Sequence, residues 1–145
     1  MASSALLPRN LFSSPGHVAR VTNPNTVNTP ALQLIDEALV EALETPDSRL
    51  IISMAPQEGK SVRVANDFPV WALTRNPDLR IVTASYGQSL ANRNGRAIRN
   101  RILTHAKWQI LHTLRPVKEI ARELGYDDEF YFSRLFKKAT GYSPT

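Results

Sequence analysis

Apolar side chains recur every three or four residues in the C-terminal part of the chain, in the pattern of two short amphipathic helices. The stripe of the first helix consists of Val117, Ile120, Ala121 and Leu124, and that of the second of Phe132, Leu135, Phe136 and Ala139. Gly125 and Gly141 suit the left-handed ends of the two helices, and Asp127 is a candidate N-cap for the second. The pattern predicts two helices joined by a glycine turn, the second over residues 128–140.

Small residues stand where these two helices would cross, because Ala121 and Gly125 are four positions apart. Close crossing is a requirement of a helix-turn-helix whose second helix enters a major groove of DNA. In that arrangement the candidate DNA-binding residues are Glu129, Phe130, Ser133, Arg134, Lys137 and Lys138. Arg134 has the fork geometry for a guanine edge, and the lysines suit phosphates. The alternative is a helical hairpin that binds nothing.

The stretch IAxxLGYxDxFYFSRLFKKxxGYSP closely resembles the second helix-turn-helix of AraC/XylS-type transcription regulators. The resemblance covers residues 106–145, in which 106–113 are similar to the end of the family's linking helix. It implies a DNA-binding domain over residues 104–145, with double-stranded DNA as the partner. It also implies a role in transcription regulation, in the cytoplasm of a bacterial or phage-infected cell.

The N-terminal part begins with residues 1–30, which are rich in Pro, Ser and Asn and show no sustained period. They predict a flexible leader, and the absence of acidic residues leaves a transit peptide as the alternative. Residues 31–43 then form an amphipathic pattern that predicts a helix, with Asp36 and the other acidic residues on its outer face.

A phosphate-binding loop is the next expectation. Residues 50–54 are a short apolar run with β-branched members, typical of a buried parallel strand. The run leads into Gly59, Lys60 and Ser61, which offer backbone N–H groups, an ammonium and a hydroxyl for a nucleotide and its Mg²⁺. With a helix over 61–74, bent at Pro69, and a second strand over 80–85, the pattern predicts an α/β fragment: a β-α-β P-loop unit with an incomplete sheet.

The segment RLIISMAPQEGKSVRVANDFPVWALTRNPDLRIVTASYGQSLANRNGRAIRNRI resembles the N-terminal ATPase region of phage terminase large subunits. The resemblance covers residues 29–103 and implies an ATPase segment over 31–103. By this resemblance Lys60 and Ser61 would bind ATP and Mg²⁺. No cofactor is expected to be required for DNA binding. The first loop glycine is missing, and no Walker B strand, coupling motif or nuclease carboxylates follow, which favours a chain without catalysis.

The two resemblances meet near residues 104–105 without a linker, which suggests a fusion of two fragments. Three functions follow: a DNA-binding module, an ATP-binding fragment of a packaging terminase, or a fusion without evolved activity. The first two are distinguished by whether ATP is bound in a way that depends on Lys60, or DNA is bound in a way that depends on Arg134.

The composition of the chain excludes few of these three functional alternatives. The net charge of +5 permits a nucleic-acid partner. The chain has no cysteine, and its three histidines are scattered, so thiolate and histidine metal sites are not expected. No apolar run approaches the ~20 residues of a membrane span, so no membrane partner is expected. A helix over 88–102, continuing to about residue 113, carries arginines that are typical of a solvated face and less often of a DNA contact.

Overall fold

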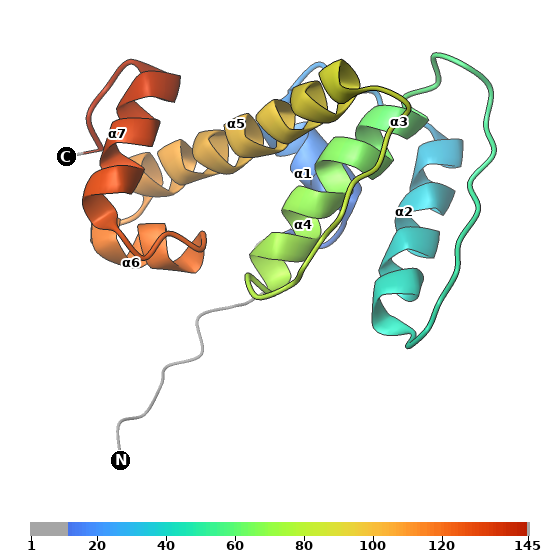
Figure 1. Ribbon diagram of the computed structural model, residues 1–145, viewed down its shortest axis with the longest axis horizontal. Helices are drawn as coiled ribbons and strands as arrows, with labels where there is room; N and C mark the ends of the chain where they lie inside the picture. Colours follow the sequence, from blue (N-terminus) through green and yellow to red (C-terminus); the bar gives the residue numbers. More distant parts are fainter. Residues whose placement is uncertain (1–11, 145) are drawn as a thin grey trace.

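The computed structural model describes residues 12–144, and all regular structure in that range is helical. The elements are α1 (Pro15–Thr22), α2 (Pro30–Glu44), α3 (Lys60–Val62), the π-helical turn η1 (Arg63–Asp67), α4 (Phe68–Arg75), α5 (Gln88–His112), α6 (Val117–Glu123) and α7 (Glu129–Thr140). Figure 1 shows α5 as a long rod, with α6 and α7 at its C-terminal end and α1 to α4 around its other half.

The predicted α/β fragment is wrong. Within the described residues, neither 50–54 nor 80–85 belongs to a strand; both are extended connections. In Figure 1 the first runs along the outside of α2, and the second passes over α4. A strand requires a paired neighbour for its backbone N–H and C=O groups, and neither segment has one here. The β-α-β unit is therefore absent, and only its helical middle is present.

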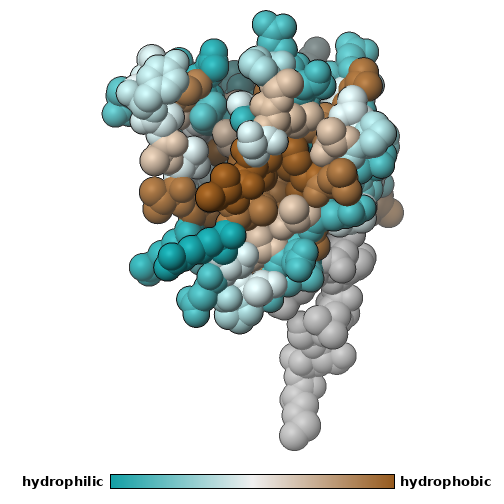
Figure 2. Space-filling model, turned by 90° about the vertical axis from the view of Figure 1, so that its right-hand side faces the viewer, coloured by the Kyte–Doolittle hydropathy of each residue, from teal (hydrophilic) through white to brown (hydrophobic). Residues whose placement is uncertain are grey.

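The first of these connections still has an inner and an outer side. Ile52 and Met54 pack against a small core formed by Leu32, Ile35 and Leu39 of α2, whereas Ile51 is 95% exposed. Figure 2 shows apolar side chains gathered near the centre of the molecular face on this side. The exposed large apolar residues of α2 and of this connection are Leu34, Leu50 and Ile51.

Part of the predicted flexible leader is helical. Pro15 occupies the first turn of α1, and the hydroxyl of Ser14 accepts a hydrogen bond from the backbone N–H of His17. Val18 and Ala19 are buried. The carbonyl of Phe12 accepts a hydrogen bond of 3.0 Å from the indole N–H of Trp71. The flexible leader is therefore contradicted in this stretch, while residues 1–11 lie outside the described range.

Helix α5 is shared by two hydrophobic cores, and its observed length confirms the predicted continuous helix. The N-terminal core contains Phe12, Val18, Val70, Trp71 and Ala72, with Ile98 and Ile102 of α5 packed against it. The C-terminal core contains Leu103, Ala106, Ile120, Ala121, Phe132 and Phe136. Because residues 98–106 of one helix enter both cores, the two ends of the molecule are joined by continuous packing.

The helix predicted over 61–74 is present but is divided by η1, which ends just before Pro69. Proline has no N–H and cannot continue the normal ladder of hydrogen bonds, and a π-helical turn accommodates that interruption. The turn places Arg63 and Asp67 inside the molecule, where they are each 2% exposed. A charged pair this deep requires partners.

Those partners come from α2 and α5. The guanidinium of Arg63 pairs with Asp36, and its Nε lies 3.6 Å from Asp67. Asp67 also accepts from Arg101 Nε at 2.8 Å. The expected outward position of Asp36 is wrong, since it is 5% exposed. Burial raises the pKa of both carboxyl groups, while their arginine partners act in the opposite direction.

Candidate nucleic-acid interface

The turn between α6 and α7 begins with a Schellman motif. Gly125 has a φ of 80°, the left-handed conformation that suits glycine. The backbone N–H of Tyr126 donates to the carbonyl of Ala121 at 2.9 Å, and that of Gly125 donates to Arg122 at 3.0 Å. These bonds satisfy carbonyls at the end of α6, and the chain turns at Gly125 as the sequence predicts.

Helix α7 is capped by Asp128, whereas the sequence suggested Asp127. The carboxylate of Asp128 accepts from the backbone N–H groups of Phe130 at 2.8 Å and Tyr131 at 3.0 Å. The ring of Tyr126 packs against Phe132, with centroids 5.4 Å apart. Burial raises the pKa of the Tyr126 phenol, and the guanidinium of Arg99 opposes this effect. The start of the helix is therefore fixed by both a polar cap and an aromatic contact.

One face of α7 is held in the C-terminal core. Phe132 and Phe136 are 0% and 3% exposed, and they pack with Ile120 and Ala121 of α6 and with α5. The buried stripe is narrower than predicted, because Leu135 is half-buried and Ala139 is exposed. The close approach expected at Ala121 is consistent with its burial, at 1% exposure. This packing determines which side of α7 faces solvent.

The candidate DNA-binding residues lie on the remaining faces of α7. Phe130 is 79% exposed, and Arg134, Lys137 and Lys138 are also exposed. Glu129 and Ser133 are half-buried. Residues 130, 134 and 137 are spaced by four and three positions, so they share the side opposite Phe132 and Phe136. The structure thus brings an apolar ring and two cations together on one exposed face.

The candidate nucleotide-binding residues do not lie between a strand and a helix, as a phosphate-binding loop requires. Gly59 has a φ of 86°, and Lys60 and Ser61 open α3, which spans only Lys60–Val62. They line a pocket of about 460 Å³ formed by residues 54–62. No strand precedes the loop in this described region, so the strand-loop-helix context of a phosphate loop is missing. Nucleotide binding here, and Mg²⁺ at Ser61, stay predictions.

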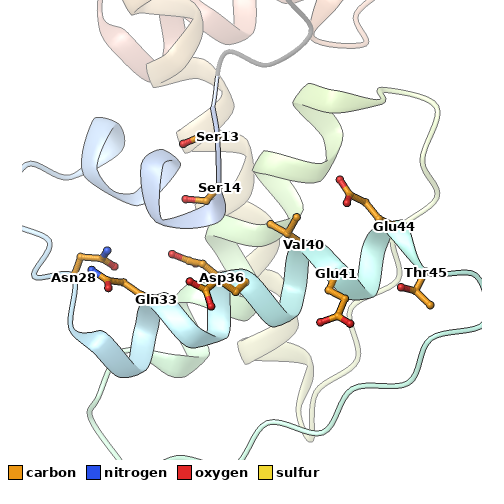
Figure 3. A pocket seen from close by; sticks show the side chains of 10 residues that line it. Ser13, Ser14, Asn28, Gln33, Asp36, Val40, Glu41, Glu44 and Thr45 are labelled. Carbon is orange, nitrogen blue, oxygen red and sulfur yellow. The ribbon is translucent and has the colours of Figure 1, made fainter.

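A larger pocket of about 610 Å³ lies beside α2 and was not expected from the sequence. Figure 3 shows Asp36, Glu41 and Glu44 along one wall and Ser13 and Ser14 across from them. Its acidic lining disfavours a phosphate ligand. Among the described residues no group of three His, Cys, Asp or Glu is placed to hold a metal ion.

Comparison with known proteins supports a helix-turn-helix in the C-terminal part of the chain. Residues 80–145 match the family model of a helix-turn-helix domain. The matched range contains α5, α6 and α7. The chain is 44% identical over 43 residues to the arabinose operon regulatory proteins of Salmonella typhimurium and Escherichia coli. These matches support the resemblance to AraC-type regulators.

The extent of these matches is limited. The match to the arabinose regulators covers 30% of this chain and only 15% of either regulator. No solved structure matches the chain significantly. The resemblance of residues 29–103 to terminases, and with it ATP binding, receives no support from these comparisons. No helix of the described residues is both long and apolar enough to cross a membrane.

Proposed function

We propose that the chain binds double-stranded DNA through α7, which lies in a major groove as the recognition helix of a transcription regulator. The observation that carries this proposal is the division of α7 into two faces. Phe132 and Phe136 anchor one face in the core, while Phe130 and Arg134 stand on the exposed face. The relatives that share this segment are named as regulators of an operon. Such a module works where the DNA is, in the cytoplasm of a bacterial cell.

Each exposed group on α7 has a chemistry suited to a duplex. Arg134 can donate two hydrogen bonds to a guanine edge, and the ring of Phe130 can contact a thymine methyl group. Glu129 can accept from a cytosine amino group, and Ser133 can bond to either kind of edge. The ammonium groups of Lys137 and Lys138 suit phosphate oxygens. We assign these contacts to a binding domain over residues 104–145, supported by α5.

Affinity is expected to be modest and sensitive to salt, because a single module contacts few phosphates. The test is a titration of a fluorescent duplex of mixed sequence at about 50 and 200 mM salt. The double variant Arg134→Ala with Lys137→Ala should lose most of the binding at both concentrations. Circular dichroism would verify that this variant keeps its helices, since both side chains are exposed.

The matched control is Arg49→Ala with Arg80→Ala, which removes the same charge from exposed positions in the two long connections. This control should bind as the unchanged protein does, apart from a small effect of net charge. Equal binding by the unchanged protein and the Arg134/Lys137 double variant would overturn the proposal. A selection from random duplexes would then give the sequence preference of α7.

A further inference from the structure

A cationic pocket lies between α5 and α7, beside the exposed face of α7 that carries Phe130, Arg134 and Lys137. It has a volume of about 560 Å³ and is lined by Arg99, Asn100, Leu103, Thr104, Leu135, Lys138, Ala139 and Thr140. Its lining has two cations and no carboxylate. Neither Arg99 nor Lys138 forms an ion pair with a carboxylate in the part of the chain that the structure describes. The pocket is therefore an uncompensated positive site.

The donors in this pocket are restricted to three side chains. The hydroxyl of Thr104 already donates to the carbonyl of Asn100 at 2.9 Å, and that of Thr140 donates to Phe136 at 2.8 Å. The remaining donors are the guanidinium of Arg99, the amide of Asn100 and the ammonium of Lys138. Leu103 and Leu135 provide apolar lining. Convergent donors with a net positive charge suit a phosphate group, which presents only acceptors and a negative charge.

We propose that this pocket holds a backbone phosphate of the same duplex that α7 reads, with Arg99 and Asn100 of α5 acting beside Lys138. The inference rests on the proposed function of α7. It adds a contact from α5, which joins the DNA-binding surface without entering the groove. Lys138 lies one turn beyond Arg134 on α7, so a strand that borders the groove read by Arg134 is within reach of the pocket. This contact would position the domain on the duplex and would not select bases.

The test measures how the logarithm of the binding constant falls with the logarithm of salt concentration. Each neutralised phosphate contributes a slope of about −0.9. Arg99→Ala and Lys138→Ala should each make the slope shallower. In the double variant the magnitude of the slope should fall by about 0.9 in total. That is the contribution of one phosphate, as expected if both side chains contact the same group. Asn100→Ala should weaken binding with little change in slope, and all three should affect every duplex sequence alike.

Arg93→Ala is the matched control, because Arg93 is an exposed arginine of α5 that does not line the pocket. It should leave the slope unchanged. If Arg134 is required for binding but the slope is the same with and without Arg99 and Lys138, the pocket proposal falls and the proposed function of α7 stands. If the unchanged protein binds no duplex at any salt concentration, both fall.

A separate arm distinguishes DNA from free phosphate as the source of the ligand. Inorganic phosphate is titrated into the full chain at constant ionic strength, and the amide resonances of Asn100 and Thr104 are followed. Saturable shifts that Arg99→Ala abolishes, combined with an unchanged DNA slope, would assign the pocket to a free phosphate compound and overturn the backbone contact. Shifts that appear only with duplex would support it.

Discussion

The imidazole ring of His105 packs against the ring of Phe12, with centroids 4.7 Å apart and planes inclined at 60°. Phe12 belongs to the N-terminal core, whereas His105 is on α5 next to Ala106 of the C-terminal core. His105 is 3% exposed, and neither of its ring nitrogens has a hydrogen-bond partner among the described residues. The contact between these two rings therefore places a neutral, unpaired histidine at the junction of the two cores.

This junction should make stability depend on pH. Burial lowers the pKa of His105 from 6.5 to about 4, and the nearby Glu123 only partly opposes the shift. The unfolded chain takes up the proton below about 6.5, and the folded chain does so only below about 4. Stability should therefore be full above that window and should fall by about 3 kcal/mol as the pH decreases through it.

Urea unfolding at several pH values across this window measures the effect, with His105→Leu as the comparison. Asp36 and Asp67 act in the opposite sense: burial raises their pKa values, so the folded state takes up their protons first. Both proteins contain these carboxyl groups, so the difference between the two pH profiles isolates His105. Parallel profiles would show that the histidine titrates normally in the fold.

Replacement of Asp128 by alanine should destabilise the protein by about 1 kcal/mol, because the variant loses the acceptor for two N–H groups at the start of α7. Asp127→Ala removes the same charge one position earlier, where the structure shows no cap. It should have little effect on the free energy of unfolding. Denaturant titrations of the two variants compare them directly, and equal losses would assign the cap to charge alone.

Gly16→Ala should be strongly destabilising. A Cβ atom at this position would overlap the carboxylate of Asp36 and would lie 2.6 Å from Arg63 Nη1, so the buried ion pair would have to move. Gly95→Ala is the matched control, because no atom apart from its chain neighbours and the nearby backbone of α5 lies within 4 Å of its Cβ position. Within α5 this change should stabilise by up to about 1 kcal/mol. Thermal unfolding of both variants would reveal shifts of opposite sign.

Alanine substitutions of two phenylalanines on α7 should have different effects, one on stability and the other on DNA binding. Phe132→Ala removes a fully buried ring and should cost about 3–5 kcal/mol of stability. Phe130→Ala removes a ring that is 79% exposed and should change stability by less than about 0.5 kcal/mol. We expect Phe130→Ala to weaken duplex binding while the fold is retained. A large loss of stability in this variant would mean that the ring packs inside.

The helices could be predicted where periodicity and end signals agreed. The stripe containing Phe132 and Phe136, and the glycine turn at Gly125, correctly predicted α6 and α7. The proline and serine that begin α1 were also visible, since Ser14 and Pro15 have the N-cap and first-turn preferences. These signals alone did not predict a helix, because eight residues are too few to show a period.

The failures arose where tertiary context decides. A β-branched run such as residues 50–54 is compatible with a strand, but strand formation requires a neighbour that the described chain does not provide. Asp36 was expected on an outer face because charged residues are seldom buried, and nothing in the sequence pairs it with Arg63. The π-helical turn brings them together, and no periodicity in the sequence indicates that turn. The pocket between α5 and α7 depends likewise on how two helices cross.

Helix α5 passes through both cores without a break, with Ile98 and Ile102 in one and Leu103 and Ala106 in the other. A continuous helix resists bending between adjacent turns, so α5 links the positions of the elements in the two cores. Because α1 and α4 pack on one half of α5 and α6 and α7 pack on its other end, a displacement of α1 or α4 that moves α5 would also move α7. In the proposed DNA complex, such a displacement would change the orientation of α7 in the groove.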